Sequence, residues 1–170
     1  MTWWQPSNRA DPRSCLIADR HYSRQKIGSP QFVPPGRCVV YRHEDEALWT
    51  TSWPYAEYVR HAWAGAWMNS MFRNESDRLS SDLIIEAVAH TRSVWEPPAL
   101  GMVTFVDDHK TRRKRDPGRC YRRAGFTHVG FTKGGLWAFQ MLPEDMPDPV
   151  PAVKVDAPTT KIPQLPKEKA

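Results

Sequence analysis

The sequence lacks the features of membrane, exported and fibrous proteins. It has no run of about eighteen apolar residues, which a transmembrane helix requires. Its start, Met1-Thr2-Trp3-Trp4, has neither the basic residues nor the apolar stretch of a signal peptide, so we expect no export. The three cysteines, Cys15, Cys38 and Cys120, form no Cys-x-x-Cys pair. They argue against a disulfide framework and a cysteine zinc site, and they indicate a reducing cytosol.

What the sequence does contain is typical of one globular domain. Its 170 residues are 40% apolar and 25% charged, enough to build a real core. No internal repeat is visible. Residues 143–170 hold seven of the sixteen prolines and almost no aromatic side chains, so they cannot bury enough apolar area to offset the entropy of ordering. We therefore expect a folded domain over residues 11–142 and an extended or disordered tail over residues 143–170.

The positive charge is concentrated in one segment. The whole chain carries +5, whereas residues 110–123 alone carry +7, so all other residues together sum to −2. The basic residues of this segment are Lys110, Arg112, Arg113, Lys114, Arg115, Arg119, Arg122 and Arg123. Such a segment on a nearly neutral body favours a polyanion partner, with phosphate the obvious candidate. A solvated loop without a partner is equally compatible with the pattern, and no apolar helical face accompanies the charges to favour a membrane surface.

Apolar periodicity predicts a mixed α/β order of elements. The elements expected, in chain order, are a helix over residues 14–24 with Leu16 and Ile17 facing inward, a hairpin of strands 38–41 and 47–53, a strand within residues 63–72, a helix over 81–95, a strand over 100–106, a helix over 117–124 and a closing hairpin of strands 127–132 and 136–142. Ser80 or Ser81 can cap the second helix, Pro97 forbids its continuation, and Gly125 is placed to stop the third.

The second half of this order resembles the GNAT acyltransferases. The matching residues are the strand at 100–106, Asp107 at its end, and the Tyr121-x-x-x-Gly125-Phe126 sequence that closes a short helix before a hairpin. GNAT enzymes hold the pyrophosphate of acyl-CoA on a glycine-rich loop before their central helix. Residues 72–81 occupy that place here and contain no glycine, which leaves the helix start and the Ser80 and Ser81 hydroxyls to bind an anion.

A closer resemblance is to the phage Mom family of DNA adenine modification proteins, which have a GNAT-like fold. The motifs that carry it are His21-Tyr22-Ser23, Phe72-Arg73-Asn74-Glu75 followed by Leu79-Ser80-Ser81, Val103-Thr104-Phe105-Val106-Asp107, and residues 116–126 running on to Gly130, Thr132 and Gly135-Leu136. The resemblance implies conversion of the adenine N6 amine of double-stranded DNA to a carbamoylmethyl derivative, which shields phage DNA from restriction in the cytoplasm of the infected bacterial host. It also implies an acyl-CoA or related donor, and iron in some members.

Two residues are the candidate catalytic groups. Tyr121 occupies the position where many GNAT enzymes place a general acid, and its alternative role is to pack its ring as a half-buried helix residue. Asp107 closes a strand in the centre of the fold, where a carboxylate can orient or deprotonate an amine, and its alternative role is a turn or cap. Adenine's exocyclic amine is a poor nucleophile, so a positioned base and a pocket for the extruded base are expected.

Five further residues are candidates for binding, and each also has a purely structural interpretation. Ser80 and Ser81 bind cofactor or cap a helix, or do both. His21 and Tyr22 are candidate ligands of a hard, oxidisable metal such as iron, although a lone histidine at a helix end is more often a cap or packing residue. Glu75 is a site carboxylate or the partner of Arg73.

Cys120 and the tryptophans are the last candidates for chemistry or binding. Cys120 has no adjacent histidine to activate it, so we expect a small packing residue rather than a nucleophile. Of the eight tryptophans, Trp49, Trp53, Trp63 and Trp67 could form a stacking platform for a flipped base, although core packing explains most of them. Trp53 is the candidate for an exposed one.

The sequence thus predicts a DNA adenine modifying enzyme in which Lys110, Arg112, Arg113, Lys114, Arg115, Arg119 and Arg122 contact the DNA backbone. Two alternatives remain at this point. One is an ordinary GNAT acyltransferase acting on a protein or small amine. The other is a DNA-binding module on a GNAT-like scaffold without catalytic activity.

Overall fold

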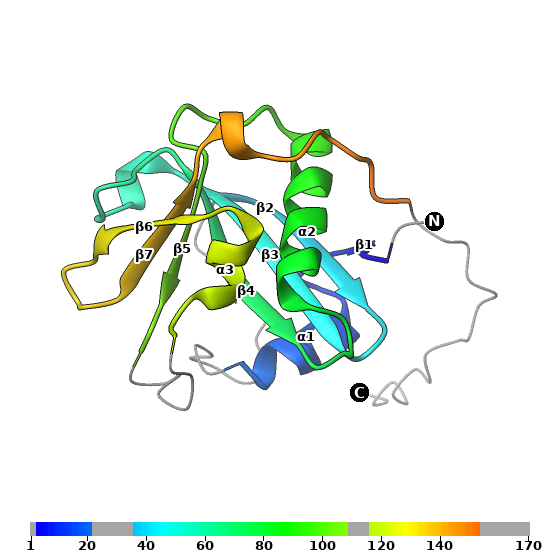
Figure 1. Cartoon of the computed structure of the whole chain (residues 1–170). Helices are drawn as coiled ribbons and strands as arrows, with labels where there is room; N and C mark the ends of the chain where they lie inside the picture. Colours follow the sequence, from blue (N-terminus) through cyan, green and yellow to red (C-terminus); the bar gives the residue numbers. More distant parts are fainter. Residues whose placement is uncertain (1–2, 22–35, 109–115, 154–170) are drawn as a thin grey trace, which may run out of the picture.

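The computed structural model of the chain describes residues 3–21, 36–108 and 116–153 (Figure 1). The elements are β1 (Gln5–Ser7), α1 (Pro12–Asp19), β2 (Gly36–His43), β3 (Ala47–Pro54), the 3-10 helix η1 (Ala56–Tyr58), β4 (Trp67–Asn74), α2 (Ser80–Val94), β5 (Met102–Val106), α3 (Arg119–Ala124), β6 (Thr127–Phe131), β7 (Trp137–Met141) and the 3-10 helix η2 (Pro143–Asp145). The predicted mixed α/β class and the order of its helices and strands are confirmed. None of the helices in these ranges is both long and apolar enough to cross a lipid bilayer.

The strands form one seven-stranded sheet in the order β1-β2-β3-β4-β5-β7-β6. All neighbours are antiparallel except β4 and β5, which run parallel because α2 connects them as a crossover. The larger core lies between the sheet and the face covered by α2 and α3, which stand in front of the strands in Figure 1. A smaller core, with Ile17 and Met71 among its members, lies under α1 on the opposite face.

Helix α1 begins earlier and ends earlier than predicted. Asp11 caps it by accepting a hydrogen bond from the Arg13 backbone N–H at 3.0 Å, and Pro12 occupies the first helical position. The prediction that Leu16 faces inward is wrong, since its side chain is 61% exposed while Ile17 is buried. A helix that packs on the sheet through one face buries one stripe of side chains, and Leu16 falls outside it.

Helix α2 is predicted to within one residue, but its cap differs from the prediction. The N-cap is Leu79, and no side chain caps the helix there. Ser80 and Ser81 are the first two residues of the helix, whereas a capping side chain belongs to the residue before it. At the other end of the domain, α3 stops at Gly125, which adopts the left-handed conformation at φ 108° as expected.

Both ends of the folded unit reach further than the predicted boundaries at residues 11 and 142. Strand β1 pairs with β2, and the Trp4 indole is buried and donates a hydrogen bond to the Leu83 carbonyl of α2 at 2.9 Å. After β7, the chain passes over the C-terminal end of α2 (Figure 1), with Met146 buried and the Val150 N–H donating to the Ala89 carbonyl. The rest of the predicted tail, residues 154–170, lies outside the described residues.

Candidate functional site

The strands β4 and β5 pair over a short length and then part. Trp67, Met68 and Asn69 lie opposite Met102, Val103 and Thr104, and no further pairs join these two strands. Beyond this point β4 continues to Asn74 against β3, while β5 stays paired with β7. The side chains of Asn69 and Thr104 therefore stand where the sheet divides, and α3 lies over them from the face it shares with α2.

A β-bulge in β4 decides which side chains face α3. Thr50 pairs with Met71 and Thr51 with Asn69, so Ser70 is the extra residue. Because a bulge shifts the alternation of side chains by one, Asn69 and Phe72 both face the side of α3 while Met71 packs with α1.

The carboxamide of Asn69 is held by four polar groups. Its Nδ2 donates to the Thr50 carbonyl at 3.1 Å and to the Met71 carbonyl at 3.0 Å, the two backbone groups that flank the bulge. Its Oδ1 accepts from the Tyr121 hydroxyl at 2.7 Å and lies 3.2 Å from the Thr104 hydroxyl. A flipped carboxamide would point its oxygen at two carbonyl oxygens, so this orientation is determined by the hydrogen-bond network.

The ring of Tyr121 is half-buried among aromatic neighbours. Its centroid lies 5.5 Å from that of Phe126, 6.3 Å from Phe139 and 6.4 Å from Phe72. The predicted packing of the ring is therefore confirmed, and the hydroxyl reaches the division of the sheet.

The direction of the Asn69–Tyr121 hydrogen bond limits what Tyr121 can do. The Asn69 Oδ1 atom has no hydrogen, so the phenol must donate its proton in this bond. A phenol oxygen that donates in one hydrogen bond can still accept another, for instance from an N–H group. To act as a general acid toward a leaving group, as the GNAT resemblance implies, the hydroxyl would first have to leave Asn69.

Asp107 follows β5 directly and is half-buried. Val106, the residue before it, pairs with Trp137 at the start of β7. Asp107 therefore stands at the end of the same strand that carries Thr104, as the sequence predicts.

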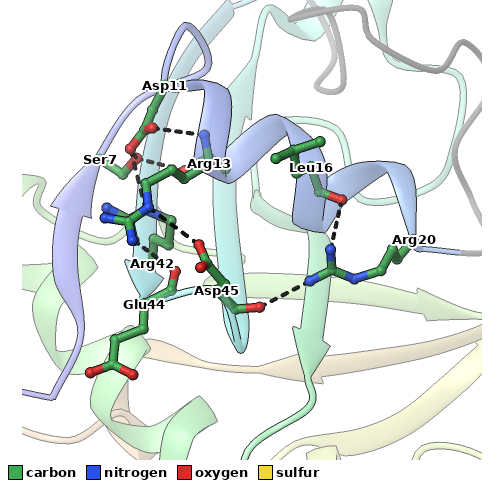
Figure 2. Close-up of polar contacts among 9 residues, drawn as sticks. Ser7, Asp11, Arg13, Leu16, Arg20, Arg42, Glu44 and Asp45 are labelled. Carbon is green, nitrogen blue, oxygen red and sulfur yellow. Dashed lines mark hydrogen bonds and ion pairs between the residues drawn. The ribbon is translucent and has the colours of Figure 1, made fainter. Parts of the chain in front are cut away.

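A second constellation joins motifs that are distant in the sequence. The Arg20 guanidinium, at the end of α1, bonds Glu75 Oε2 at 2.9 Å after β4 and the Asp45 carbonyl in the β2–β3 turn at 2.9 Å. Figure 2 shows the neighbouring contacts, in which Arg13 pairs with Asp45, and Arg42 with Asp11, each at 3.3 Å. These contacts join Arg20, the residue before His21, to the loop that leads from β4 to α2.

Glu75 is a partner of arginines in this network. Partial burial raises the pKa of its carboxyl, but the hydrogen bonds and charges of Arg20 and Arg73 outweigh burial and hold the pKa below its ordinary value. The Arg73 Nε atom lies 3.3 Å from the same carboxylate oxygen. The predicted pairing of Glu75 with Arg73 is therefore confirmed.

The predicted cofactor residues begin α2, directly after the loop that Asn74 organises. Asn74 Nδ2 donates to the Arg78 carbonyl at 2.8 Å and to Ser80 Oγ at 3.0 Å, and its Oδ1 accepts from the Ser76 N–H. This carboxamide shapes the approach to α2 without a glycine. Ser80 is thus held in place by Asn74, and Ser81 beside it is half-buried.

The predicted DNA-binding residues are described only in part. Arg119 and Arg122 are exposed on α3, and Arg122 forms an ion pair with Asp116. Lys110, Arg112, Arg113, Lys114 and Arg115 lie outside the described residues. The described ends of that segment, Asp108 and Asp116, connect it to β5 and α3.

The predicted metal ligands are not brought into a ligand group by the described residues. His21 is half-buried, its backbone N–H donates to the Ala18 carbonyl, and Tyr22 lies outside the described ranges. Within those ranges the group with ligand spacing is His43, Glu44 and Glu46, whose ligand atoms lie within 4.8 Å of one another. His43 stacks on Trp3 at 3.8 Å and bonds its carbonyl, a packing role that explains this ring. The chemistry proposed below therefore does not use iron.

The tryptophans predicted as a stacking platform belong mainly to the core. Trp49 and Trp67 are fully buried. Trp53, the predicted exposed residue, is half-buried instead, with its ring near Trp95 at 5.5 Å and Arg37 over its face at 4.5 Å. Trp63 packs near Phe105 at 6.0 Å. Their spacing of four reflects packing, as the alternative interpretation held.

Sequence reasoning missed Asn69 and Thr104. The available signal was Asn69 within a predicted strand and the Thr104 hydroxyl within an otherwise apolar one. Asparagine is disfavoured in strands unless a bulge or a hydrogen-bond network uses it. Cys120, expected to be a packing residue, is half-buried on α3.

Comparison of the chain with protein-family models, with curated proteins and with solved structures found no significant match. The function must therefore be inferred from the site and from the residue motifs.

Proposed function

We propose that the chain is a DNA-modifying enzyme on a GNAT-like fold that acts on the N6 amine of adenine. The observation that carries this proposal is the Tyr121–Asn69 hydrogen bond at the point where β4 and β5 part. A parallel pair that divides at the centre of an otherwise antiparallel sheet, followed by a short helix and a closing hairpin, is the arrangement that resembles the GNAT acyltransferases. The Mom-like motifs supply the substrate class and the carbamoylmethyl product.

The geometry favours an amine as the group that Tyr121 binds. The Tyr121 hydroxyl donates a hydrogen bond to Asn69. In this proposal the Tyr121 oxygen accepts a hydrogen bond from one N–H of the amine and thereby orients the nitrogen lone pair. The co-reactant is a donor whose carbamoylmethyl carbon is bonded to a leaving group. As the nitrogen–carbon bond forms, the bond to the leaving group breaks and its electron pair departs with that group, while Asp107 takes the proton that the nitrogen loses. Binding and orientation are needed here because the adenine lone pair is delocalised into the ring.

DNA is the proposed partner because the residues around α3 are basic. Arg119, Arg122 and Arg123 are exposed there, and the basic residues of segment 110–115 adjoin the same helix in sequence. Phosphate contacts of this kind position DNA without selecting sequence. In this proposal the enzyme works on phage DNA in the host cytoplasm and protects it from restriction.

An acyltransferase that acts on a protein or small amine is the second candidate. The observation that favours it is the N-terminus of α2, where Leu79 supplies no capping side chain. A phosphate oxygen of acyl-CoA can take the place of such a cap, with the Ser80 and Ser81 hydroxyls beside it.

Mass spectrometry of host DNA tests the proposal. The protein is expressed in bacteria, the genomic DNA is digested to nucleosides, and we expect a deoxyadenosine made heavier by the carbamoylmethyl group. Tyr121→Phe and Asp107→Asn should each reduce its amount by about a hundredfold or more, because each removes a group that orients or deprotonates the amine. Tyr55→Phe and Asp77→Asn change exposed residues of the same types and should leave the amount unchanged.

The two alternatives predict different results from the same protein. Unmodified DNA from cells that contain soluble, folded protein would contradict the proposal. Acetyl-CoA hydrolysis or transfer without DNA would then favour the acyltransferase, and salt-sensitive DNA binding without a modified base would favour the binding module.

A further inference from the structure

A row of aromatic rings lies on the hairpin of β6 and β7. His128 pairs with Phe139 and Phe131 pairs with Trp137, with an irregularity in the register between His128 and Gly130. This bulge places His128 and Phe131 on the same face although they are three residues apart. Gly130 adopts φ 145° there, a conformation that side-chain-bearing residues rarely take. Bulges commonly re-aim side chains at functional sites.

The rings contact one another and lead away from the candidate site. His128 stacks on Trp137 at 4.9 Å with an interplanar angle of 26°, and Phe131 meets Trp137 edge-on at 5.5 Å. Phe139 lies between this group and Tyr121, 5.3 Å from His128 and 6.3 Å from Tyr121. The row therefore runs from Tyr121 to Phe131 at the edge of the sheet.

Phe131 is the exposed end of the row. Its side chain is 57% exposed, whereas His128 and Trp137 are half-buried. His128 Nε2 donates to the Gly130 carbonyl at 3.0 Å, which fixes the imidazole against Trp137. Phe131 thus presents an aromatic surface to solvent, and its partner Trp137 on β7 pairs with Val106, the residue before Asp107.

The exposed charges of α3 and of the β6–β7 turn favour a polyanion partner. Arg119, Arg122 and Arg123 of α3 are exposed, and so is Lys133 in the β6–β7 turn. Asp116 offsets one of them through its ion pair with Arg122. Aromatic rings interleaved with arginine and lysine are the composition of surfaces that bind unpaired nucleic-acid strands, because rings stack on bases and cations contact phosphates.

We propose that His128, Phe131 and Trp137 form a stacking surface for an unpaired nucleobase of the DNA substrate. Trp137 pairs with Val106, the residue before Asp107, and Phe139 connects the surface to Tyr121. The surface would therefore hold a base displaced with the target adenine or next to it in the strand. This inference rests on the proposed function for its choice of DNA.

A binding measurement on the full chain tests the surface. Fluorescence anisotropy is recorded with a labelled duplex that contains one unpaired adenine, and 2-aminopurine replaces that adenine in a parallel titration. Phe131→Ala should weaken binding about tenfold and reduce the quenching of 2-aminopurine, because it removes one base-stacking contact. Phe131→Trp keeps a ring and should bind within about twofold of the unmutated chain.

Val129→Ala is the matched control. Val129 is 40% exposed on the same strand, at the bulge that separates His128 from Phe131. It should leave both the affinity and the quenching unchanged. Equal binding by Phe131→Ala and the unmutated chain, or an equal loss in Val129→Ala, would overturn the proposal. So would a change from dimer to monomer in Phe131→Ala with unaltered DNA affinity, because the surface would then join two copies of the chain.

The same data separate this inference from the proposed function. One outcome is weaker binding by Phe131→Ala together with host DNA that the unmutated chain leaves unmodified. It would support the stacking surface and contradict the modification activity. A chain that modifies adenine normally when Phe131 is alanine, with unchanged affinity, would contradict the stacking surface alone.

Discussion

At the scale of single residues, Asn69 connects the backbone of the sheet to the candidate catalytic group. One carboxamide donates to two carbonyls at the bulge and accepts a hydrogen bond from the Tyr121 hydroxyl, so the bulge and the phenol are held in one network. Asn69 is only 5% exposed, and a buried polar group left without its partner costs about 1–3 kcal/mol. The position of the Tyr121 hydroxyl thus depends on a residue that makes no chemical step itself.

Asn69→Ala should lower the free energy of unfolding by about 3 kcal/mol, because it removes the buried hydrogen bonds that the carboxamide makes to two carbonyls and to the Tyr121 hydroxyl. Urea unfolding followed by circular dichroism measures this. Asn8→Ala, which removes one side-chain acceptor in an exposed turn, is the control and should cost less than about 1 kcal/mol. In a double-mutant cycle with Tyr121→Phe we expect a coupling energy of about 1 kcal/mol. Strict additivity would show that Asn69 and Tyr121 do not interact.

At the scale of elements, the close approach of α3 to β7 sets the place of Tyr121. Gly118 caps α3 at φ 74°, and a Cβ atom added there would lie 2.2 Å from Cζ of Phe139. Phe139 in turn stacks on Tyr121. A glycine is required at this position both for its backbone conformation and for the space that the Phe139 ring occupies.

Gly118→Ala should therefore destabilise the protein by about 3 kcal/mol and disturb the aromatic signal in near-ultraviolet circular dichroism, because the Phe139 ring must move. Gly135→Ala is the matched control. Gly135 has a similar φ of 85°, but an added Cβ would meet no atom within 4 Å. It should cost only the strain of the left-handed conformation, about 1 kcal/mol. Equal losses in the free energy of unfolding for the two variants would mean that contact between the added Cβ atom and the Phe139 ring does not destabilise the protein.

At the scale of the whole molecule, Glu86 and His90 of α2 join the two ends of the described chain. The Trp3 N–H donates to Glu86 Oε1 at 3.1 Å, and His90 Nε2 lies 3.6 Å from the same oxygen. The buried His90 ring also bonds the Val150 carbonyl through Nδ1 at 2.6 Å. The segments before β1 and after η2 are thus parts of one polar network on α2.

This network makes stability depend on acid. The nearby His90 imidazole lowers the pKa of Glu86 most, burial opposes this effect, and the Trp3 N–H and the Arg78 charge lower the pKa further. A carboxyl with a lowered pKa in the folded state stabilises that state above its ordinary pKa, and the contribution disappears as pH falls through the folded value. The free energy of unfolding should therefore fall on acidification below about pH 5 more steeply in the unmutated chain than in Glu86→Gln.

Urea unfolding at a series of pH values measures this difference. Glu57→Gln, which removes an exposed carboxyl on η1, is the control for the loss of a negative charge. Parallel curves for Glu86→Gln and the unmutated chain would contradict the role of Glu86. A variant curve that is lower near neutral pH and meets the unmutated curve in acid is the expected result.

The sequence by itself determined the local structure of this protein. Periodicity and chain breakers located α2 to within one residue and the end of α3 at Gly125, because these signals act over a few neighbouring residues. The place of Tyr121 after a strand and within a short helix followed from the same kind of signal. The predicted start at residue 11 failed, since β1 and Trp4 are ordered by contacts with distant segments.

The tertiary structure alone decided which of these residues meet and which reach solvent. Asn69 and Tyr121 are 52 residues apart, and they meet only because β4 and β5 part after three pairs and a bulge turns Asn69 toward α3. Trp67 became buried and Phe131 exposed for the same reason, since the sheet order places β4 at the centre and β6 at the edge. Hydropathy ranks both rings as apolar, and their burial depends on how many neighbouring elements cover them.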